Sequence, residues 1–169
     1  MSNQVPVKTI RTLSERYELL RKTLAHYLLL QVGTFVKAIG FDSVGPAMEI
    51  LTAKKADLKV RDIIGKGRGS GMDAVEALSQ NLAESMGETF DSDYDVKAGD
   101  SSRTVTLARC GCIESVMAQA GDHGLTAPQA RAIFCGTCLG SYRKAAESLD
   151  LRFKGRLSKE GCMMGFSRK

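Results

Sequence analysis

Through the first ninety residues, apolar side chains recur every three or four positions, which is the spacing of one face of an α-helix. The longest such run, residues 10–38, predicts a single long amphipathic helix that ends at Gly40. The residues that set its spacing are Leu13, Tyr17, Leu20, Leu24, Tyr27, Gln31 and Phe35.

Two more helices are predicted in this part of the chain. One covers residues 43–64 and has Pro46 in its first turn. The glycine-rich segment 65–71 then interrupts the pattern, and Ser70 with Asp73 resembles a capping box that opens a third helix. Its inward positions are expected to be Met72, Val75, Leu78, Leu82 and Met86.

Beyond residue 90 the spacing of apolar residues changes to two, the period of a β-strand. Residues 94–96 and 103–110 predict two strands, joined by a turn at Gly99-Asp100. Residues 151–157 and 163–167 predict two further strands near the end of the sequence.

Between the two strand pairs, residues 113–120 predict a short helix and residues 126–149 a long one. Strand pairs with helices segregated between them indicate an α+β fold, in which N-terminal helices precede a small antiparallel sheet with helices packed on one face. No linker divides the chain, so we expect residues 1–169 to form a single domain. Its parts are a helical one, 1–90, and a cysteine-rich α+β one, 91–169.

The composition is that of a globular protein. Of the 169 residues, 43% are hydrophobic and 25% are charged, which argues against an extensively disordered chain. No apolar run approaches the roughly 20 residues of a membrane span, and the start of the sequence lacks the apolar core of a secretory signal. We therefore expect a cytoplasmic protein with no membrane partner.

The net charge of +5 is unevenly distributed. Residues 1–68 carry twelve lysines and arginines against six acids, whereas residues 69–100 carry eight acids against one lysine. A basic first third would suit a nucleic-acid surface, but its cations are mixed with acids at helical spacing, and aromatic residues make up only 6%. A solvated helix face explains the pattern better, so a nucleic-acid partner is disfavoured.

The five cysteines all follow residue 109, as Cys110-x-Cys112, Cys135-x-x-Cys138 and Cys162. Positions two apart on a strand, or three apart on a helix, share one face, and the last cysteine follows a glycine in a turn. In a reducing compartment, clustered cysteines indicate metal or redox chemistry more often than disulfides. The sequence therefore predicts that at least four of these cysteines converge on one metal ion or iron–sulfur cluster.

Four thiolates suit either Zn²⁺ or a 4Fe-4S cluster. The expected cofactor ligands are Cys112, Cys135, Cys138 and Cys162, with Cys110 as the alternative donor. A zinc site closed by four thiolates would be structural. A cluster with only three cysteine ligands would leave one iron open to a substrate.

Two other interpretations of the cysteines stay open. Cys135 and Cys138 belong to a helical stripe with Tyr142, Ala145 and Leu149, which would simply pack in a core because cysteine is among the most buried residue types. Alternatively, the same two cysteines form a redox-active dithiol, although they lie about two turns inside the helix rather than at its N-terminus.

Other candidate features are weaker. The segment 65–71 carries Lys66 and Arg68 before a helix, so its amides would suit an anion, but it lacks the Gly-Lys-Ser/Thr end of a P-loop. His26 is expected to be structural, and His123, beside an aspartate, is expected to be an exposed loop histidine rather than a general base.

The last third of the chain resembles a known family. The segments Val105–Cys110, Ala132-Ile-Phe-Cys135-Gly-Thr-Cys138 and Glu160-Gly161-Cys162-Met-Met-Gly-Phe166 resemble the L-2-amino-thiazoline-4-carboxylic acid hydrolase-like family. They are also similar to 4-vinyl-reductase-type small-molecule-binding domains. The resemblance implies helices first, a compact α+β body after them, and a small-molecule ligand.

The chain departs from the family pattern at two places. The hydrolase-like family tends to show Cys-x-x-Asp where this chain has Cys135-x-x-Cys138, and its Gly-Asp-x-x-Cys-x-Phe ending differs from Gly161-Cys162 here. In the zinc-binding relatives the helix carries Glu-x-x-Cys, so Cys135 would stand in for that carboxylate. Sulfur in place of oxygen favours soft metals and weakens the case for the hydrolase activity.

The sequence thus predicts a metal- or iron–sulfur-cluster-binding protein that holds a small molecule or senses redox state, and that forms a homodimer through its long first helix. The alternative is a hydrolase or lyase of a sulfur-containing or cyclic small molecule, with Cys135 or Cys112 as nucleophile or with an open-iron cluster. A nucleic-acid-binding regulator is a third hypothesis, for which a helix-turn-helix motif is missing. Whether the protein is an enzyme is left open.

Overall fold

A computed structural model describes residues 12–169, so the expected helix start at residue 10 lies outside the described residues. The chain begins with helices α1 (Leu13–Ile39), α2 (Gly45–Gly65) and α3 (Gly71–Leu82), the last continued by a π-helical segment, η1 (Ala83–Glu88). The elements that follow are β1 (Asp93–Gly99), β2 (Ser102–Arg109), α4 (Gly111–Gln119), the 3-10 helix η2 (Ala120–His123), α5 (Ala127–Ser148), β3 (Leu151–Leu157) and β4 (Cys162–Arg168).

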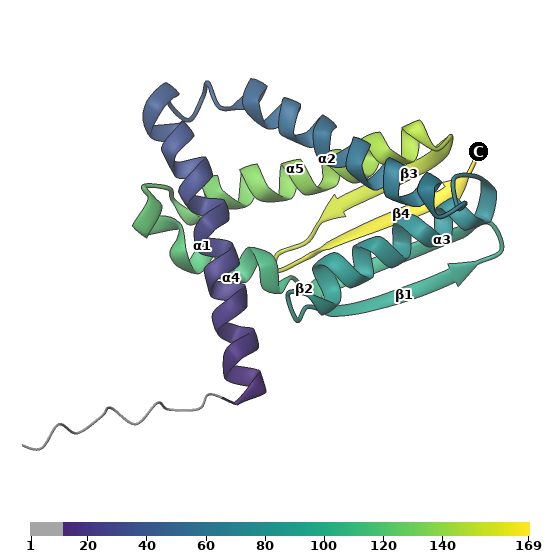
Figure 1. Ribbon diagram of the computed structural model, residues 1–169, viewed down its shortest axis with the longest axis horizontal. Coiled ribbons are helices and arrows are strands. Elements are labelled where there is room, and N and C mark those ends of the chain that lie inside the picture. The colour runs from purple at the N-terminus through teal and green to yellow at the C-terminus, as the bar shows by residue number, and fades with distance from the viewer. Residues whose placement is uncertain (1–11) are drawn as a thin grey trace, which may run out of the picture.

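The four strands form one antiparallel sheet in the order β1-β2-β4-β3 (Figure 1). Helices α3 and α5 pack against the same face of this sheet, while α1 crosses α4 at the far end of the molecule. The predicted α+β fold, with N-terminal helices and a small antiparallel sheet covered on one face, is confirmed.

Local sequence signals explain where the long helices begin. At α5, the Thr126 hydroxyl accepts a hydrogen bond from the N–H of Gln129 at 3.3 Å, and the Gln129 side chain accepts one from the N–H of Thr126 at 2.9 Å, which is a full capping box. The predicted box at Ser70 is wrong, because that side chain makes no capping hydrogen bond. Helix α3 instead begins at Gly71, whose φ of +56° is the left-handed conformation that favours glycine.

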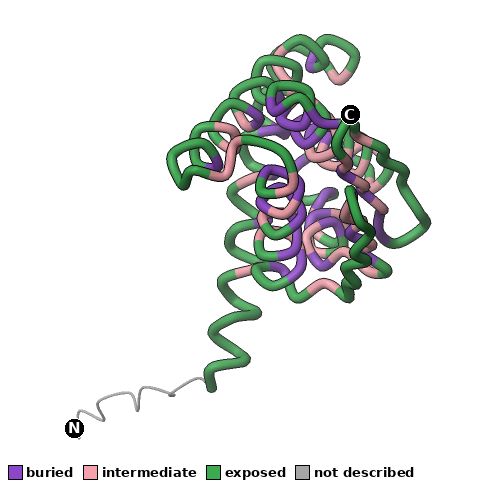
Figure 2. The backbone as a smooth tube through the Cα atoms, turned by 90° about the vertical axis from the view of Figure 1, so that its right-hand side faces the viewer, coloured by how far each residue is buried: buried purple, intermediate pink, exposed green. Residues whose placement is uncertain are grey.

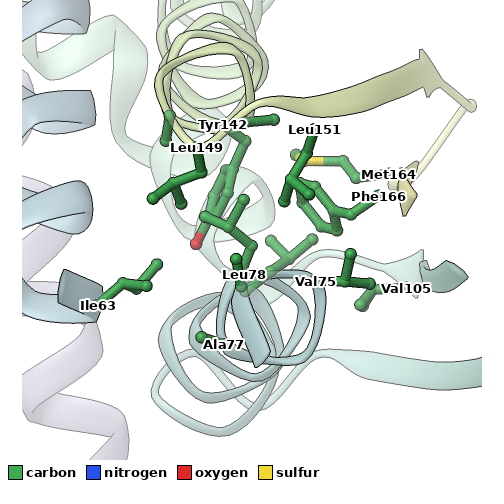
Figure 3. Close-up of a cluster of buried hydrophobic side chains, with 14 of the residues drawn as sticks. Ile63, Val75, Ala77, Leu78, Val105, Tyr142, Leu149, Leu151, Met164 and Phe166 are labelled. Carbon is green, nitrogen blue, oxygen red and sulfur yellow. The ribbon is translucent and has the colours of Figure 1, made fainter. Parts of the chain in front are cut away.

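Buried side chains form two clusters. In the sheet-side cluster, α3 packs on β2 and β4, and α5 packs on β3 and, through Tyr142 and Phe166, against β4 (Figure 3). Its largest fully buried members are Tyr142, Phe166, Leu78, Leu82, Leu107 and Met164. The helix-side cluster joins α1, α4 and α5 through Ala25, Leu29, Val32, Val44, Ile113, Val116, Ala120, Leu125, Ala130 and Ile133.

Helix α1 is attached to the body along one stripe and leaves its other sides open. Its buried residues are Ala25, Leu29, Val32 and Gly33. The apolar residues that set its spacing in the sequence lie instead on the exposed side: Leu13 is 74% exposed and Leu20 63%. The first two turns project from the body with every residue exposed (Figure 2).

None of the helices within residues 12–169 combines the length and the apolarity that a membrane crossing requires. The expected cytoplasmic location stays a prediction.

Candidate functional site

The fold brings all five cysteines to the wall of one cavity of about 40 Å³. They come from the junction of β2 and α4, the middle of α5 and the start of β4, so segments far apart in the sequence meet here. The rest of the wall is almost entirely apolar and consists of Met86, Leu107, Ile113, Phe134, Leu139, Leu157, Gly161 and Met164. All five predicted ligands therefore line the same cavity, and the rest of that cavity is apolar.

Cys110 and Cys112 reach the cavity differently from what the strand pattern predicts. Strand β2 ends at Arg109, Cys110 is the N-cap of α4, and Cys112 lies in the first turn of that helix. The two thiols therefore do not share a strand face. Cys110 packs against both buried clusters, which places the cavity where the two clusters meet.

Two glycines, Gly111 and Gly161, allow the cysteine-bearing segments to reach the cavity. No sequence pattern points to Gly111. A Cβ atom on Gly111 would lie 1.9 Å from the carbonyl oxygen of Phe90, and one on Gly161 would lie 1.9 Å from that of Leu107. Neither position has room for any side chain. The close backbone approach at each site sets the path of the adjoining cysteines, Cys110 and Cys112 at the first and Cys162 at the second.

The turn before Cys162 is held in place by α5. The guanidinium of Arg131 donates hydrogen bonds to the carbonyl oxygens of Ser158 and Lys159, and the N–H of Cys110 donates to the carbonyl of Glu160 at 2.9 Å. These bonds tie the β3–β4 turn to the end of β2. As a result, Cys162 begins β4 as a buried residue rather than lying free in a turn.

The apolar wall keeps the cysteines protonated. Burial raises the pKa of the Cys138 and Cys162 thiols to about 12, and it also raises the pKa of Cys112 and Cys135. Neighbouring thiols add like-charge repulsion, and at Cys138 the ammonium groups of Lys59 and, more weakly, Lys55 act in the opposite direction on the pKa. With no cation bound beside them, these four side chains are thiols at neutral pH.

The prediction that the protein works through a metal ion or an iron–sulfur cluster is wrong on this evidence. Within residues 12–169, no group of three or more cysteine, histidine, aspartate or glutamate side chains is arranged to hold a metal ion. The five thiols line one largely apolar cavity, but they are not arranged as a ligand set within the described residues. The expected identity of a cofactor, a 4Fe-4S cluster or Zn, is a separate prediction that no observation tests.

Of the other interpretations of the cysteines, core packing agrees with the structure. Cys138 packs against the sheet-side cluster, which contains Tyr142, Ala145 and Leu149, and Cys135 packs against the helix-side cluster.

The two reactive interpretations gain no support. All five are free thiols, which leaves the redox-active dithiol without support. The proposed nucleophiles Cys112 and Cys135 have a raised pKa, the opposite of an activated thiol. Neither histidine serves them as a base, because His123 Nε2 and His26 Nδ1 lie 3.2 Å apart and hydrogen-bond each other.

That histidine pair corrects a second prediction. His123 is buried rather than exposed, at the end of η2, and its ring packs edge-on against His26 of α1 with 4.8 Å between ring centres. The pair fastens α1 to η2, so both histidines are structural. The interpretation of His26 as structural agrees with this contact.

The cations of the glycine-rich segment 65–71 are engaged by neighbouring side chains. Lys66 Nζ forms an ion pair with Asp62 at 2.7 Å, and Arg68 Nη1 donates to Gln80 Oε1 at 3.0 Å. They link the segment to α2 and α3, and this leaves little of their charge for an anion.

The cysteine cavity is also small for the expected ligand. Sites for small molecules usually enclose about 300–1,000 Å³, while about 40 Å³ is room for only one or a few water molecules. In this conformation the cavity is a packing defect between two cores and gives the small-molecule ligand no support.

Comparisons with known proteins add no identification. No protein-family model matches the chain, and no curated protein and no solved structure is significantly similar to it. The resemblance of the last third to the hydrolase-like family stays a prediction.

Proposed function

We propose that this protein is a self-associating interaction domain, which forms a homodimer by pairing the projecting half of α1 with the same helix of a second copy. One observation carries the proposal. The apolar residues Leu13, Tyr17, Leu20, Leu24 and Tyr27 are all exposed and follow each other at alternating intervals of four and three.

That alternation is the heptad spacing of a coiled-coil seam, in which two equivalent helices interlock their side chains. It differs from the stripe that attaches α1 to its own body, Ala25, Leu29 and Val32. A helix with apolar residues on both sides is usually buried on both sides. The body covers one side of α1, and a second copy would cover the other.

The exposed area is sufficient for a specific contact. The five seam residues are between 38% and 74% exposed, which corresponds to roughly 600 Å² per chain if a fully exposed large side chain has about 200 Å². Two copies would bury roughly 1,200 Å², the lower end of the range for specific interfaces.

Charge and shape favour antiparallel pairing. In a parallel pair with this heptad register, Arg16 of one helix would lie beside Arg21 of the other, a like-charge contact that costs stability. The body is attached near the C-terminal half of α1 (Figure 1). Antiparallel overlap of the free halves would therefore place the two bodies at opposite ends, without a clash.

The test is the molar mass in solution, measured by sedimentation or light scattering over a wide concentration range. Leu20→Glu puts a carboxylate into the seam, and we expect it to weaken the dimer by at least about tenfold in Kd, as expected for a charge desolvated at an apolar contact. Thr23→Glu is the matched control, because it adds the same charge to an exposed flank of the same helix, where coiled coils tolerate charges.

A monomer at all concentrations would refute the proposal. So would equal masses for the wild type and Leu20→Glu, because the seam would then not be the contact.

A further inference from the structure

We infer that the solvent-facing side of the sheet is a binding surface for the phosphate backbone of single-stranded nucleic acid, used without base-specific contacts. This inference is independent of the proposed dimer. It starts from the two faces of the sheet, one covered by α3 and α5 (Figure 3) and the other open.

The open face carries a column of cations on the edge strand β3. Leu151 and Phe153 point toward the helices, so the alternate residues Arg152, Lys154 and Arg156 point outward, and all three are exposed. Within the described residues, none of their three side chains makes a hydrogen bond or an ion pair, although their backbones pair with β4. Neighbours in the column are two residues apart, or roughly 6.6 Å along the strand.

Hydroxyl groups continue from this column across the sheet. The register places Arg152 beside Ser167, which is itself beside Ser102. One row further along, Lys154 lies beside Gly165, which lies opposite Thr104.

These rows line a shallow groove of about 350 Å³. It is formed by Ser101, Ser102, Thr104, Arg152, Lys154, Met163, Gly165, Phe166 and Ser167. The floor of the groove is low at Gly165 of β4, because no side chain fills the space between Lys154 and Thr104 there.

The chemistry of the groove fits phosphate oxygens. Arginine, lysine, serine and threonine make most of the contacts that proteins form with nucleic-acid backbones. A strand bears one negative charge every few ångströms, so a linear column of cations above a row of hydroxyls matches a linear polyanion better than a single compact anion. The outward positions of the described sheet hold no aromatic residue on which a base would stack. Binding through this face would therefore be independent of base sequence.

Protection of an edge strand explains only part of this arrangement. Charged residues on an edge do discourage strand pairing between molecules, and β3 is an edge. Discouraging strand pairing at the edge does not require any particular side chains on the interior strands β2 and β4. It does not account for the hydroxyl row at Ser167, Ser102 and Thr104, which lies on β4 and β2.

The test uses the full chain and a labelled oligothymidylate of about 20 nucleotides, with affinity measured by fluorescence anisotropy. Three phosphate contacts on a single strand predict a slope of about −2 in log affinity against log salt. Lys154→Gln/Arg156→Gln removes two of the three cations. We expect this double variant to bind the oligonucleotide roughly tenfold or more weakly at low salt. The slope of log affinity against log salt should become shallower, between 0 and about −1.

The matched control is Lys54→Gln/Arg143→Gln, which changes the net charge equally on exposed positions of α2 and α5, away from the open face. We expect it to retain binding within about twofold, since its charges lie outside the groove. The dimer-seam variant Leu20→Glu should also bind the oligonucleotide, which separates this inference from the proposed dimer.

Three outcomes would overturn the inference. The first is equal loss in both double variants, which would mean attraction by net charge alone. The second is no binding at low salt. The third is displacement of the oligonucleotide by inorganic phosphate at constant ionic strength, because the groove would then be a site for a small phosphate.

Discussion

The two buried clusters of this protein are built from side chains of different size, and the difference separates a rigid body from an arm. The sheet-side cluster interlocks large residues from several elements, with Tyr142 and Phe166 1% exposed and their rings 6.0 Å apart. The helix-side cluster has no aromatic residue among its buried members and receives α1 through Ala25, Leu29 and Val32. Its close fit depends on Gly33, where a Cβ atom would lie 2.6 Å from the carbonyl oxygen of His123.

The comparison shows that how closely α1 approaches the body and how strongly it is attached to the body are separate properties. Small residues let α1 come near to η2, but they bury less apolar area than large ones, and buried area sets most of the stabilisation. The sheet-side cluster should therefore determine the stability of the whole chain. The helix-side cluster should determine mainly whether α1 stays in place. Three changes test this comparison.

The largest effect is expected from Phe166→Ala in the sheet-side cluster. Removing a fully buried aromatic ring leaves a cavity beside Tyr142 and Phe153, and such changes cost about 3–5 kcal/mol of the free energy of unfolding. Urea unfolding followed by circular dichroism measures it. Phe35→Ala is the control, since Phe35 is 50% exposed on α1, and its loss should cost less than about 1 kcal/mol. Equal losses would contradict the comparison.

A smaller effect is expected from Leu29→Ala, which shortens the largest side chain that attaches α1. We expect a loss of about 2–4 kcal/mol, felt first as local opening of α1 rather than as unfolding of the sheet. Hydrogen exchange should show faster exchange of α1 amides with little change in β2 and β4. The neighbouring Leu30→Ala, on an exposed position, is the control. Uniformly faster exchange throughout would show that α1 is part of one cooperative core.

The smallest effect is expected from ionisation of the Cys138 thiol, in the cavity where the two clusters meet, and it concerns how stability depends on pH. Burial raises the folded-state pKa of Cys138 to about 12, from an ordinary value near 9. Above pH 9 the unfolded chain therefore releases this proton while the folded chain keeps it, so stability falls as pH rises toward 12. By pH 10 the loss is between about 1 and 2 kcal/mol for this thiol.

Urea midpoints in the presence of a reductant, from neutral pH to pH 10, measure this loss. Cys138→Ala lacks the thiol, so its stability should fall less steeply over the same range. A wild type whose stability did not fall more steeply than that of Cys138→Ala would show that the thiol ionises equally well in the folded state.

Much of the fold was predictable because its signals are local. The period of three to four before residue 90 and the period of two after it predicted the helices and strands. The helix start predicted at residue 126 coincides with the capping box that opens α5. The cysteines were predicted to meet at a metal centre, and this prediction was wrong within the described residues. All five line one cavity, but the surroundings of that cavity come from several elements and are largely apolar. The spacing of the cysteines along the chain does not specify those surroundings.

The elements and the α+β class follow from the sequence alone, because propensity, capping and periodicity act over a few residues. Tertiary packing brought the five thiols to one cavity, because they lie on segments far apart in the sequence. Only the tertiary structure decided which side of α1 is buried, since both of its sides are apolar. It alone buried His123 against His26, moved Cys112 from a strand to a helix, and left Arg152, Lys154 and Arg156 on an open face. In each case the reason is the same: burial depends on which elements pack together, and periodicity within one element does not specify its neighbours.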